Sequence, residues 1–283
     1  MRQTQGSGGG MIDTHCHLED LLAFYPLAQV LSCAKQAGVG GLIAVGVAPS
    51  RWLAQKMAAQ QARALGDAPR FSLGLAYGIH PWWADAVAPA LGLAALARWL
   101  AQERADTLAV GEIGLDFAPN MPPMARQMAL FEGQVALAIA QALPVILHER
   151  KSADVLLKVI RQTAGLRGVV HGFVGSRQQA EQFIAQGFYL GVGAAITHPR
   201  ATRLRAMLAA LPVERLLLES DAPNQPGARH KNAPNEPAFI GEQLAVLAEI
   251  RGVEPDALGR QLDANAIALF GCGLAQSVNH GPS

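Results

Sequence analysis

The sequence predicts a single (β/α)8 TIM barrel, and three observations support this fold class. The chain has 283 residues, a usual length for one such barrel. Hydrophobic residues make up 51% of it and charged residues 16%, which is enough apolar material for one large core. Short apolar runs alternate with longer segments of helical periodicity, and this order is typical of a parallel sheet covered by helices.

Eight apolar runs bounded by Gly, Pro or Asp predict the strands. They cover residues 11–15, 42–47, 72–77, 108–113, 145–147, 168–170, 188–192 and 216–218. Segments rich in Ala, Leu and Gln between them predict helices over 27–37, 53–64, 91–102, 126–141, 153–162 and 178–186. The stretch 222–237 after the last strand is rich in Pro, Asn and Gly, and a loop of this length is usually functional.

The ends of the chain are expected to lie outside the barrel. Residues 1–10 are rich in Gly, Ser and Gln and cannot pack, so they predict a flexible extension, native or an expression remnant. The barrel is expected over 11–273 and a C-terminal tail over 274–283. Because the middle of the chain shows no linker, charge block or internal repeat, we expect one domain.

Composition restricts the function classes. The three cysteines are odd in number and widely spaced, which excludes a disulfide framework and indicates a reducing compartment. No apolar run approaches the roughly 18–20 residues of a membrane helix, so we expect a cytoplasmic protein without a membrane partner. The net charge of +1 lacks the basic excess of a typical nucleic-acid binder. Any polyanion must therefore be held locally.

Polar residues with metal-binding side chains follow the predicted strands. They are His15 and His17 after the first strand, His80 after the third, Glu112 after the fourth, His148 after the fifth, His171 after the sixth and Asp221 after the eighth. In a parallel barrel these strand ends share one rim, where barrel enzymes place their catalytic groups. The seven side chains are therefore expected to converge.

His15 and His17 have the spacing of a chelating pair, because side chains two residues apart on a strand point to the same face. Both imidazoles can then reach one ion, while Cys16 faces away. A lone histidine at a strand end is more often structural. Glu112 taken alone has a second interpretation as a salt bridge to Arg150 or to another arginine of the rim. The complete set favours metal binding, because buried carboxylates without a cation are costly.

Six ligands exceed the need of one tetrahedral ion, so we expect two. His15, His17 and Asp221 would hold the first and His148 and His171 the second, with Glu112 bridging. This donor set suits Zn, Mn, Fe, Co or Ni, and tolerates Mg with added water ligands, and of these we expect Zn, Mn or Mg. Two such ions roughly 3.5–4 Å apart activate water, which predicts metal-assisted hydrolysis.

Several motifs in chain order carry a family resemblance. They are Ile12-Asp13-Thr14-His15-Cys16-His17-Leu18, Gly78-Ile79-His80-Pro81, Gly111-Glu112-Ile113-Gly114-Leu115-Asp116, Pro144-Val145-Ile146-Leu147-His148, His171-Gly172-Phe173-Val174-Gly175-Ser176 and Leu218-Glu219-Ser220-Asp221-Ala222-Pro223. The chain resembles the TatD family of hydrolases over residues 12–270, and within it the YjjV-like branch.

The resemblance implies an amidohydrolase-like barrel and a divalent-metal-dependent phosphodiesterase, with deoxyribonuclease activity in several members. The metal ligands of the family correspond to His15, His17, Glu112, His148, His171 and Asp221. Asp221 is implied as general base, and Glu112, His80 and Glu219 as further catalytic or pocket residues. Two departures concern the substrate: Trp82 and Trp83 follow the His-Pro pair, and Glu149 stands where a small residue is usual.

Cationic and aromatic residues after the strands are candidates for substrate contact. Arg150 and Arg200 can pair with phosphate, and Trp82 can stack on a base. Lys151, Arg177 and the cluster Arg229-His230-Lys231 are weaker candidates, and all of them also fit a solvated rim. Trp83 can pack under a loop, and Asp116 and Asn235 are expected to position their neighbours.

Three functions remain open from the sequence. The leading hypothesis is a monomeric phosphodiesterase that acts on DNA ends or single strands. The alternative is a hydrolase of a small phosphoester, amide or lactone metabolite, because the same metal cage activates water for either reaction. The third is a metal-holding scaffold, which the open two-metal site disfavours.

Overall fold

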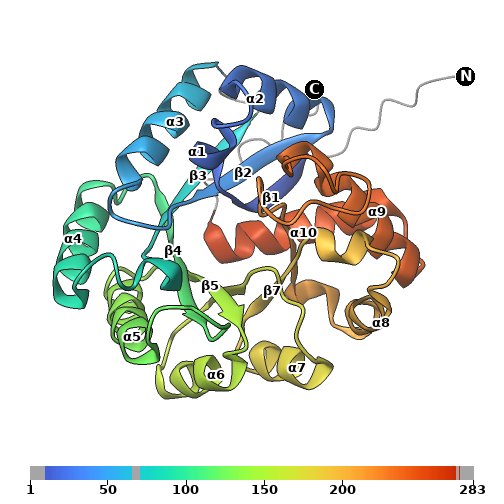
Figure 1. Cartoon of the computed structure of the whole chain (residues 1–283). Helices are drawn as coiled ribbons and strands as arrows, with labels where there is room; N and C mark the ends of the chain where they lie inside the picture. The colour runs from blue at the N-terminus through green and yellow to red at the C-terminus, as the bar shows by residue number, and fades with distance from the viewer. Residues whose placement is uncertain (1–9, 66–70, 272–273, 275–283) are drawn as a thin grey trace, which may run out of the picture.

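The computed structural model describes residues 10–65, 71–271 and 274. Eight parallel strands form one ring in chain order, and helices surround it (Figure 1). The strands are β1 (Met11–Cys16), β2 (Val39–Val45), β3 (Ser72–Tyr77), β4 (Thr107–Asp116), β5 (Val145–Arg150), β6 (Gly168–Val170), β7 (Tyr189–Val192) and β8 (Leu216–Leu218). The predicted (β/α)8 barrel is confirmed.

Hydrogen bonds at the carboxyl ends of the strands close the ring. The backbone N–H of Asp221, after β8, donates to the carbonyl of His15 in β1 over 2.8 Å. The N–H of His17 donates to the carbonyl of Ala222, also over 2.8 Å. These bonds bring the two ends of the barrel chain together at one rim, so side chains 200 residues apart in sequence become neighbours.

Helices follow the strands and alternate with them along the chain. The α-helices are α1 (Leu18–Leu21), α2 (Leu27–Gln36), α3 (Trp52–Leu65), α4 (Pro89–Gln102), α5 (Met124–Ala140), α6 (Ala153–Gln162), α7 (Arg177–Ala185), α8 (Thr202–Ala210), α9 (Ile240–Arg251) and α10 (Pro255–Phe270). Short 3-10 turns are η1 (Pro81–Trp83), η2 (Ala194–Thr197), η3 (Val213–Arg215) and η4 (Pro237–Phe239). Among the described residues, none of these helices is long and apolar enough to span a bilayer.

Two apolar clusters fill the molecule. The larger lies between the strands and the outer helices and includes Trp52, Phe131 and Phe183. The smaller fills the inside of the ring with residues of alternate strand positions, such as Ile43 and Ile146, together with Leu269 and Phe270 of α10. Helix α10 therefore closes the amino end of the barrel, and the carboxyl end is left for the site.

Two strand boundaries differ from the sequence prediction in a way that affects the site. Strand β4 continues to Asp116 and β5 to Arg150, because the two strands stay paired there: Leu115 lies opposite Glu149, and Asp116 opposite Arg150. Glu112 therefore lies inside β4 and not at its end. The register between β4 and β5 shifts between Val110 and Ile113, and such a bulge re-aims side chains.

The predicted terminal segments, 1–10 and 274–283, lie outside the described residues apart from Gly10 and Leu274. Gly10 packs on Gly40, and Leu274 is fully buried in the inner cluster. The long loop after β8 is irregular up to η4. Asn235 fixes it, because its Nδ2 donates to the carbonyl of Ser220 over 2.6 Å.

Candidate metal centre

The two histidines of the first motif point into the mouth of the barrel together. Their Nε2 atoms lie 3.3 Å apart, and Cys16 between them packs in the outer apolar cluster, as strand alternation predicted. The Nδ1 of His17 lies 3.0 Å from the carbonyl of Val45, which can only accept. A neutral His17 ring therefore carries its proton on Nδ1 and leaves Nε2 to bind a cation. Burial lowers the pKa of His17, but the hydrogen bond to Asp221 and the charge of Glu112 raise it to about 9, so without an ion Nε2 is protonated and donates to Asp221.

Asp221 approaches the same two imidazoles from the other end of the chain. Its Oδ1 lies 3.6 Å from the Nε2 of His15 and 3.3 Å from that of His17. Its Oδ2 accepts from Gln225 Nε2 over 2.8 Å. Burial raises the pKa of Asp221, but the hydrogen bond from His17 and the nearby His15 lower it to about 2. Asp221 is thus an ionised carboxylate at neutral pH.

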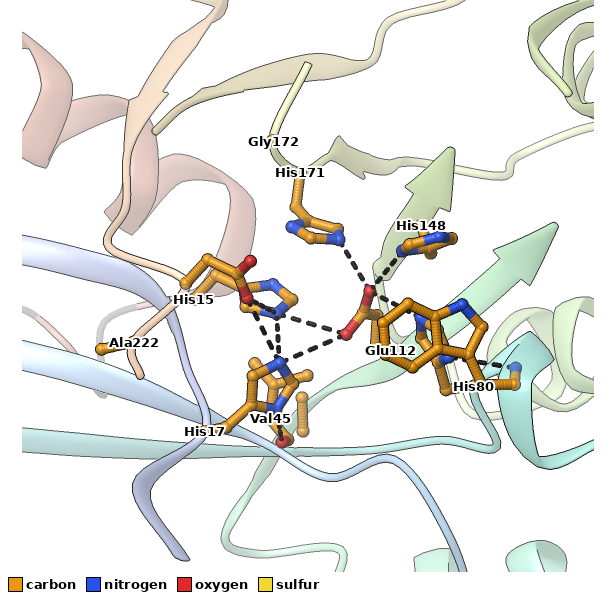
Figure 2. Close-up of polar contacts among 12 residues, drawn as sticks. His15, His17, Val45, His80, Glu112, His148, His171, Gly172 and Ala222 are labelled. Carbon is orange, nitrogen blue, oxygen red and sulfur yellow. Dashed lines mark hydrogen bonds and ion pairs between the residues drawn. The ribbon is translucent and has the colours of Figure 1, made fainter. Parts of the chain in front are cut away.

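Glu112 lies between two groups of histidines and gives one oxygen to each (Figure 2). Its Oε2 lies 3.4 Å from His15 Nε2 and 3.5 Å from His17 Nε2. Its Oε1 lies 2.9 Å from His148 Nδ1 and 2.7 Å from His171 Nε2. The ion pairs of Glu112 among the described residues are all with histidine, so the interpretation as a salt bridge to Arg150 is wrong.

We define the first set as His15, His17, Asp221 and Glu112 Oε2, and the second set as His148, His171 and Glu112 Oε1. Metal–ligand bonds of about 2.0–2.2 Å place tetrahedral donor atoms roughly 3.4 Å apart. Five of the six donor–donor distances in the first set run from 3.3 to 3.6 Å. The first set therefore fits a tetrahedral cation as it stands, whereas the second has hydrogen-bond spacing.

His80 also faces Glu112, with its Nε2 3.2 Å from Oε1. The backbone N–H of Trp82 donates to His80 Nδ1 over 3.1 Å, so the neutral ring carries its proton on Nε2. Burial lowers the pKa of His80 to about 4, which keeps the ring neutral. His80 therefore donates a hydrogen bond to Glu112, and this geometry disfavours it as a metal ligand.

Asp116 supports the second set from behind His148. Its Oδ2 lies 3.3 Å from His148 Nε2 and accepts from Trp82 Nε1 over 2.7 Å. Burial raises the pKa of Asp116, but the hydrogen bonds from His148 and Trp82 lower it below its usual value. This carboxylate fixes the imidazole so that Nδ1 faces Glu112, which is the arrangement found around metal-binding histidines.

Glu219 lies behind His171 and does not line the cavity, contrary to the expectation. It is fully buried, and its Oε1 accepts from the backbone N–H of Gly172 and lies 3.8 Å from His171 Nδ1. Its carboxylate lies against Gly191 in β7 and is not part of the cavity wall. Glu219 can thus orient His171.

The electrostatics of the cluster favour added positive charge. Burial raises the pKa of Glu112, but His171, His80 and His15 lower it well below the usual value. Burial lowers the pKa of His171, but Glu112 raises it well above the usual value. Imidazole and carboxylate donors that face one another, with no thiolate among them, suit Zn, Mn or Mg. The residues present therefore fit a divalent cation.

Comparison with known proteins agrees with this site. The family model described as TatD related DNase matches residues 12–271. The chain belongs to the TatD related DNase family. This membership confirms the prediction of a TatD-type metal-dependent hydrolase.

Relatives of the TatD family match most of the chain. The uncharacterized metal-dependent hydrolase YjjV of Escherichia coli is 38% identical over 92% of this chain and 97% of its own. The 3'-5' ssDNA/RNA exonuclease TatD of Erwinia billingiae is 37% identical over 86% of this chain and 92% of its own. The crystal structure of the E. coli YjjV protein superposes with a TM-score of 0.81 at 36% identity, covering 92% of this chain and 97% of that one.

A TatD substrate would reach the cluster through an open cavity of 510 Å³. Its wall includes His17, His80, Glu112, His148, His171 and Asp221, and around them Trp82, Trp83, Glu149 and Arg150. Trp82 is 56% exposed, so one of its faces is available to a substrate while its Nε1 is held by Asp116. Arg150 Nη1 lies 3.8 Å from Asp116 Oδ2. These two predicted substrate residues lie at the mouth.

The other cations predicted near the TatD mouth lie elsewhere. Arg200 is exposed and does not line this cavity, and neither does Lys151. Arg229 and His230 pair with Glu242 of α9, whose Oε1 lies 3.8 Å from Arg229 Nη1 and 3.1 Å from His230 Nε2. The long loop turns these side chains toward a helix, which sequence order could not show.

A cationic residue at the mouth of the TatD site was missed in the sequence. Arg51 lines the cavity and is held by Asp20, with Glu19 3.7 Å from its Nε. It follows β2, which like β7 has no metal-binding side chain directly at its end, and it lies six residues beyond that end. A search extended one turn past each strand would have found it.

Proposed function

We propose that the chain is a phosphodiesterase that uses two divalent cations to hydrolyse single-stranded nucleic acid. The observation that carries this proposal is the division of Glu112 between the first and second sets, one oxygen to each. A carboxylate in that position can bridge two ions. The Erwinia billingiae relative named as a 3'-5' ssDNA/RNA exonuclease supports the substrate class.

In this proposal His15, His17 and Asp221 would hold the first ion and His148 and His171 the second, and Glu112 would contribute to both. Two bound ions would lower the pKa of a water molecule and neutralise charge on the phosphodiester. We propose Zn, Mn or Mg, and the tetrahedral spacing of the first set favours Zn there.

The chain's own residues have separate tasks in this mechanism. Asp221, which its lowered pKa keeps ionised, would accept the proton of the attacking water through the carboxylate oxygen that does not hold the first ion. His80 donates its Nε2–H to Glu112 and so orients the bridging carboxylate. Glu219 orients His171 from behind. Arg150 and Trp82 at the mouth would meet a phosphate and a base.

The test is hydrolysis of a labelled single-stranded DNA by chelator-stripped protein, with Mg, Mn or Zn added back. We expect cleavage to return with metal and to be absent in Asp221→Ala, whose circular dichroism should match the wild type. Metal content measured by mass spectrometry gives a readout independent of activity. No cleavage at full metal content would contradict the proposal and point to a small phosphoester, amide or lactone.

We further propose that the enzyme is a cytoplasmic monomer. The supporting observation is chemical: Cys16 is a free, fully buried thiol, which suits a reducing compartment. Size-exclusion chromatography with light scattering tests the oligomeric state, and cell fractionation tests the location.

A further inference from the structure

A second cavity adjoins the mouth of the metal centre. It has a volume of 640 Å³ and is lined by Val174, Arg177, Arg203, Leu204 and Met207 among others. Val174 lines both cavities and is 61% exposed. The two hollows therefore meet over one apolar side chain, and a ligand that enters the first can continue into the second.

The second cavity carries the local positive charge that the near-neutral chain otherwise lacks. Residues 171–212 contain four arginines and a single acidic residue, Glu181, whereas the whole chain has a net charge of +1. Arg177 uses its Nε to pair with Glu181 over 2.7 Å, and its terminal nitrogens have no ion pair among the described residues. Arg203 has no ion-pair partner in the described part of the chain.

The charged groups that line this cavity are arginine side chains. Ser176 caps α7 with a capping box: its hydroxyl accepts from the N–H of Gln179, and the Gln179 side chain accepts from the Ser176 N–H. These backbone donors are already engaged. Arginine side chains on α7 and α8 remain, and their guanidinium groups suit phosphate oxygens.

We propose that the second cavity is a subsite for the sugar–phosphate backbone of a single-stranded nucleic acid whose scissile phosphate lies at the metal centre. This inference rests on the proposed function. The strand would pass over Val174, with its phosphates paired to Arg177 and Arg203. Exposed cations along a groove are the usual means of holding single strands without sequence preference. A small metabolite would fill only the first cavity.

The experiment compares the double variant Arg177→Gln/Arg203→Gln with Arg200→Gln as the matched control. Arg200 is an exposed arginine of the same segment, but it lines neither cavity. Binding of a fluorescent phosphorothioate single strand, which resists hydrolysis, is measured by anisotropy on the metal-loaded proteins at several salt concentrations. Hydrolysis of a short phosphodiester, bis(p-nitrophenyl) phosphate, is measured in parallel.

We expect the double variant to bind the long strand about 5–10-fold more weakly, since two exposed ion pairs are lost. The slope of log affinity against log salt should fall by about 1.4, because each single-strand phosphate contact contributes about 0.7. The double variant should turn over the short diester at the wild-type rate. Arg200→Gln should keep the wild-type strand affinity and salt slope.

Equal affinity and salt slope in the wild type and the double variant would overturn the subsite. So would an equal loss in Arg200→Gln, because it would show diffuse charge and not a defined cavity. Failure of the proposed function looks different: the wild type would then leave unmodified strands uncut at full metal content. A double variant that still loses strand affinity in that case would support the subsite as a binding site.

Discussion

Buried polar side chains lie at both ends of the barrel, but they have different partners. At the closed amino end, Asp263 Oδ1 accepts from the N–H of Ile12 over 2.9 Å, and Asn265 Nδ2 donates to the carbonyls of Val213 and Leu216, each over 2.8 Å. At the open end, imidazoles and carboxylates face one another. The amino end satisfies the backbone and supports the fold, whereas the open end is arranged for a cation.

The largest expected effect comes from neutralising the bridging carboxylate. Glu112→Gln leaves the shape but removes the charge that both sets share, so we expect kcat/KM to fall by about 10³-fold or more and metal content to drop. Kinetics on single-stranded DNA and metal analysis of the purified variant measure both.

Glu149→Gln is the matched control for this change. Glu149 also lines the cavity, but its Oε1 accepts from the Ser152 N–H over 2.8 Å, a bond that an amide oxygen can keep. We expect its metal content to be unchanged. A Glu112→Gln protein with wild-type metal content and activity would show that the open end does not depend on this charge.

A smaller loss of metal affinity is expected when the hydrogen-bond acceptor behind His148 is removed. Asp116→Ala deletes the acceptor at His148 Nε2, and changes of this kind lower metal affinity by about 10–100-fold. Metal titration by calorimetry measures the effect. Trp82→Phe is the control, because it removes only the indole donor to the same carboxylate. Equal metal affinities in Asp116→Ala and the wild type would contradict a supporting role.

Metal removal should affect stability as well as activity. Cations that bind only the folded state add about 2.7 kcal/mol at 100-fold excess over Kd, which raises Tm by roughly 5 °C in a chain of this size. Calorimetric scans with and without chelator measure this shift. Glu112→Gln should show little or no response to the chelator, and a full response in this variant would place the stabilising ion outside the site.

The sequence predicts the ring of strands well, because each strand is an apolar run bounded by turn residues. It fails where polar residues continue a strand. Asp116 and Arg150 lie in paired strands, although an apolar-run criterion ends both strands earlier. Pairing with a neighbouring strand supplies this stability, and pairing is not visible in a local window.

The same reasoning applies to the site. The convergence of the six proposed ligands follows from the strand ends alone, because parallel strands share a rim. Which atom of each ring faces the cluster does not follow. It depends on partners such as the Val45 carbonyl and Asp116, whose positions are set by strand register. Glu219 has the same strand phase as Asp221, and only the contacts of its carboxylate with Gly172 and Gly191 show that it lies outside the cavity wall.

The smallest expected effect concerns the closed end and is one of stability alone. Burial is the larger influence on Asp263 and raises its pKa to about 7, although the hydrogen bond from Ile12 lowers it. Below about pH 4 the carboxyl is protonated in both the folded and the unfolded chain, so it does not lower the free energy of unfolding. As the pH rises from 4 to 7, the unfolded chain releases this proton more readily than the folded chain, so the free energy of unfolding falls. Above pH 7 this loss of stability is complete.

Asp263→Asn keeps an oxygen for the Ile12 N–H and removes the buried charge. We expect the free energy of unfolding to rise by about 2 kcal/mol at pH 8 and to be unchanged at pH 4, as measured by urea titration at both values. Other titrating groups are common to both proteins, so the difference isolates Asp263. Asn265→Asp should act in the opposite direction, because it turns a carboxylate toward two carbonyls. Neither change touches the open end, so we expect the metal content of both variants to equal that of the wild type. A change in metal content would show that the two ends of the barrel are coupled.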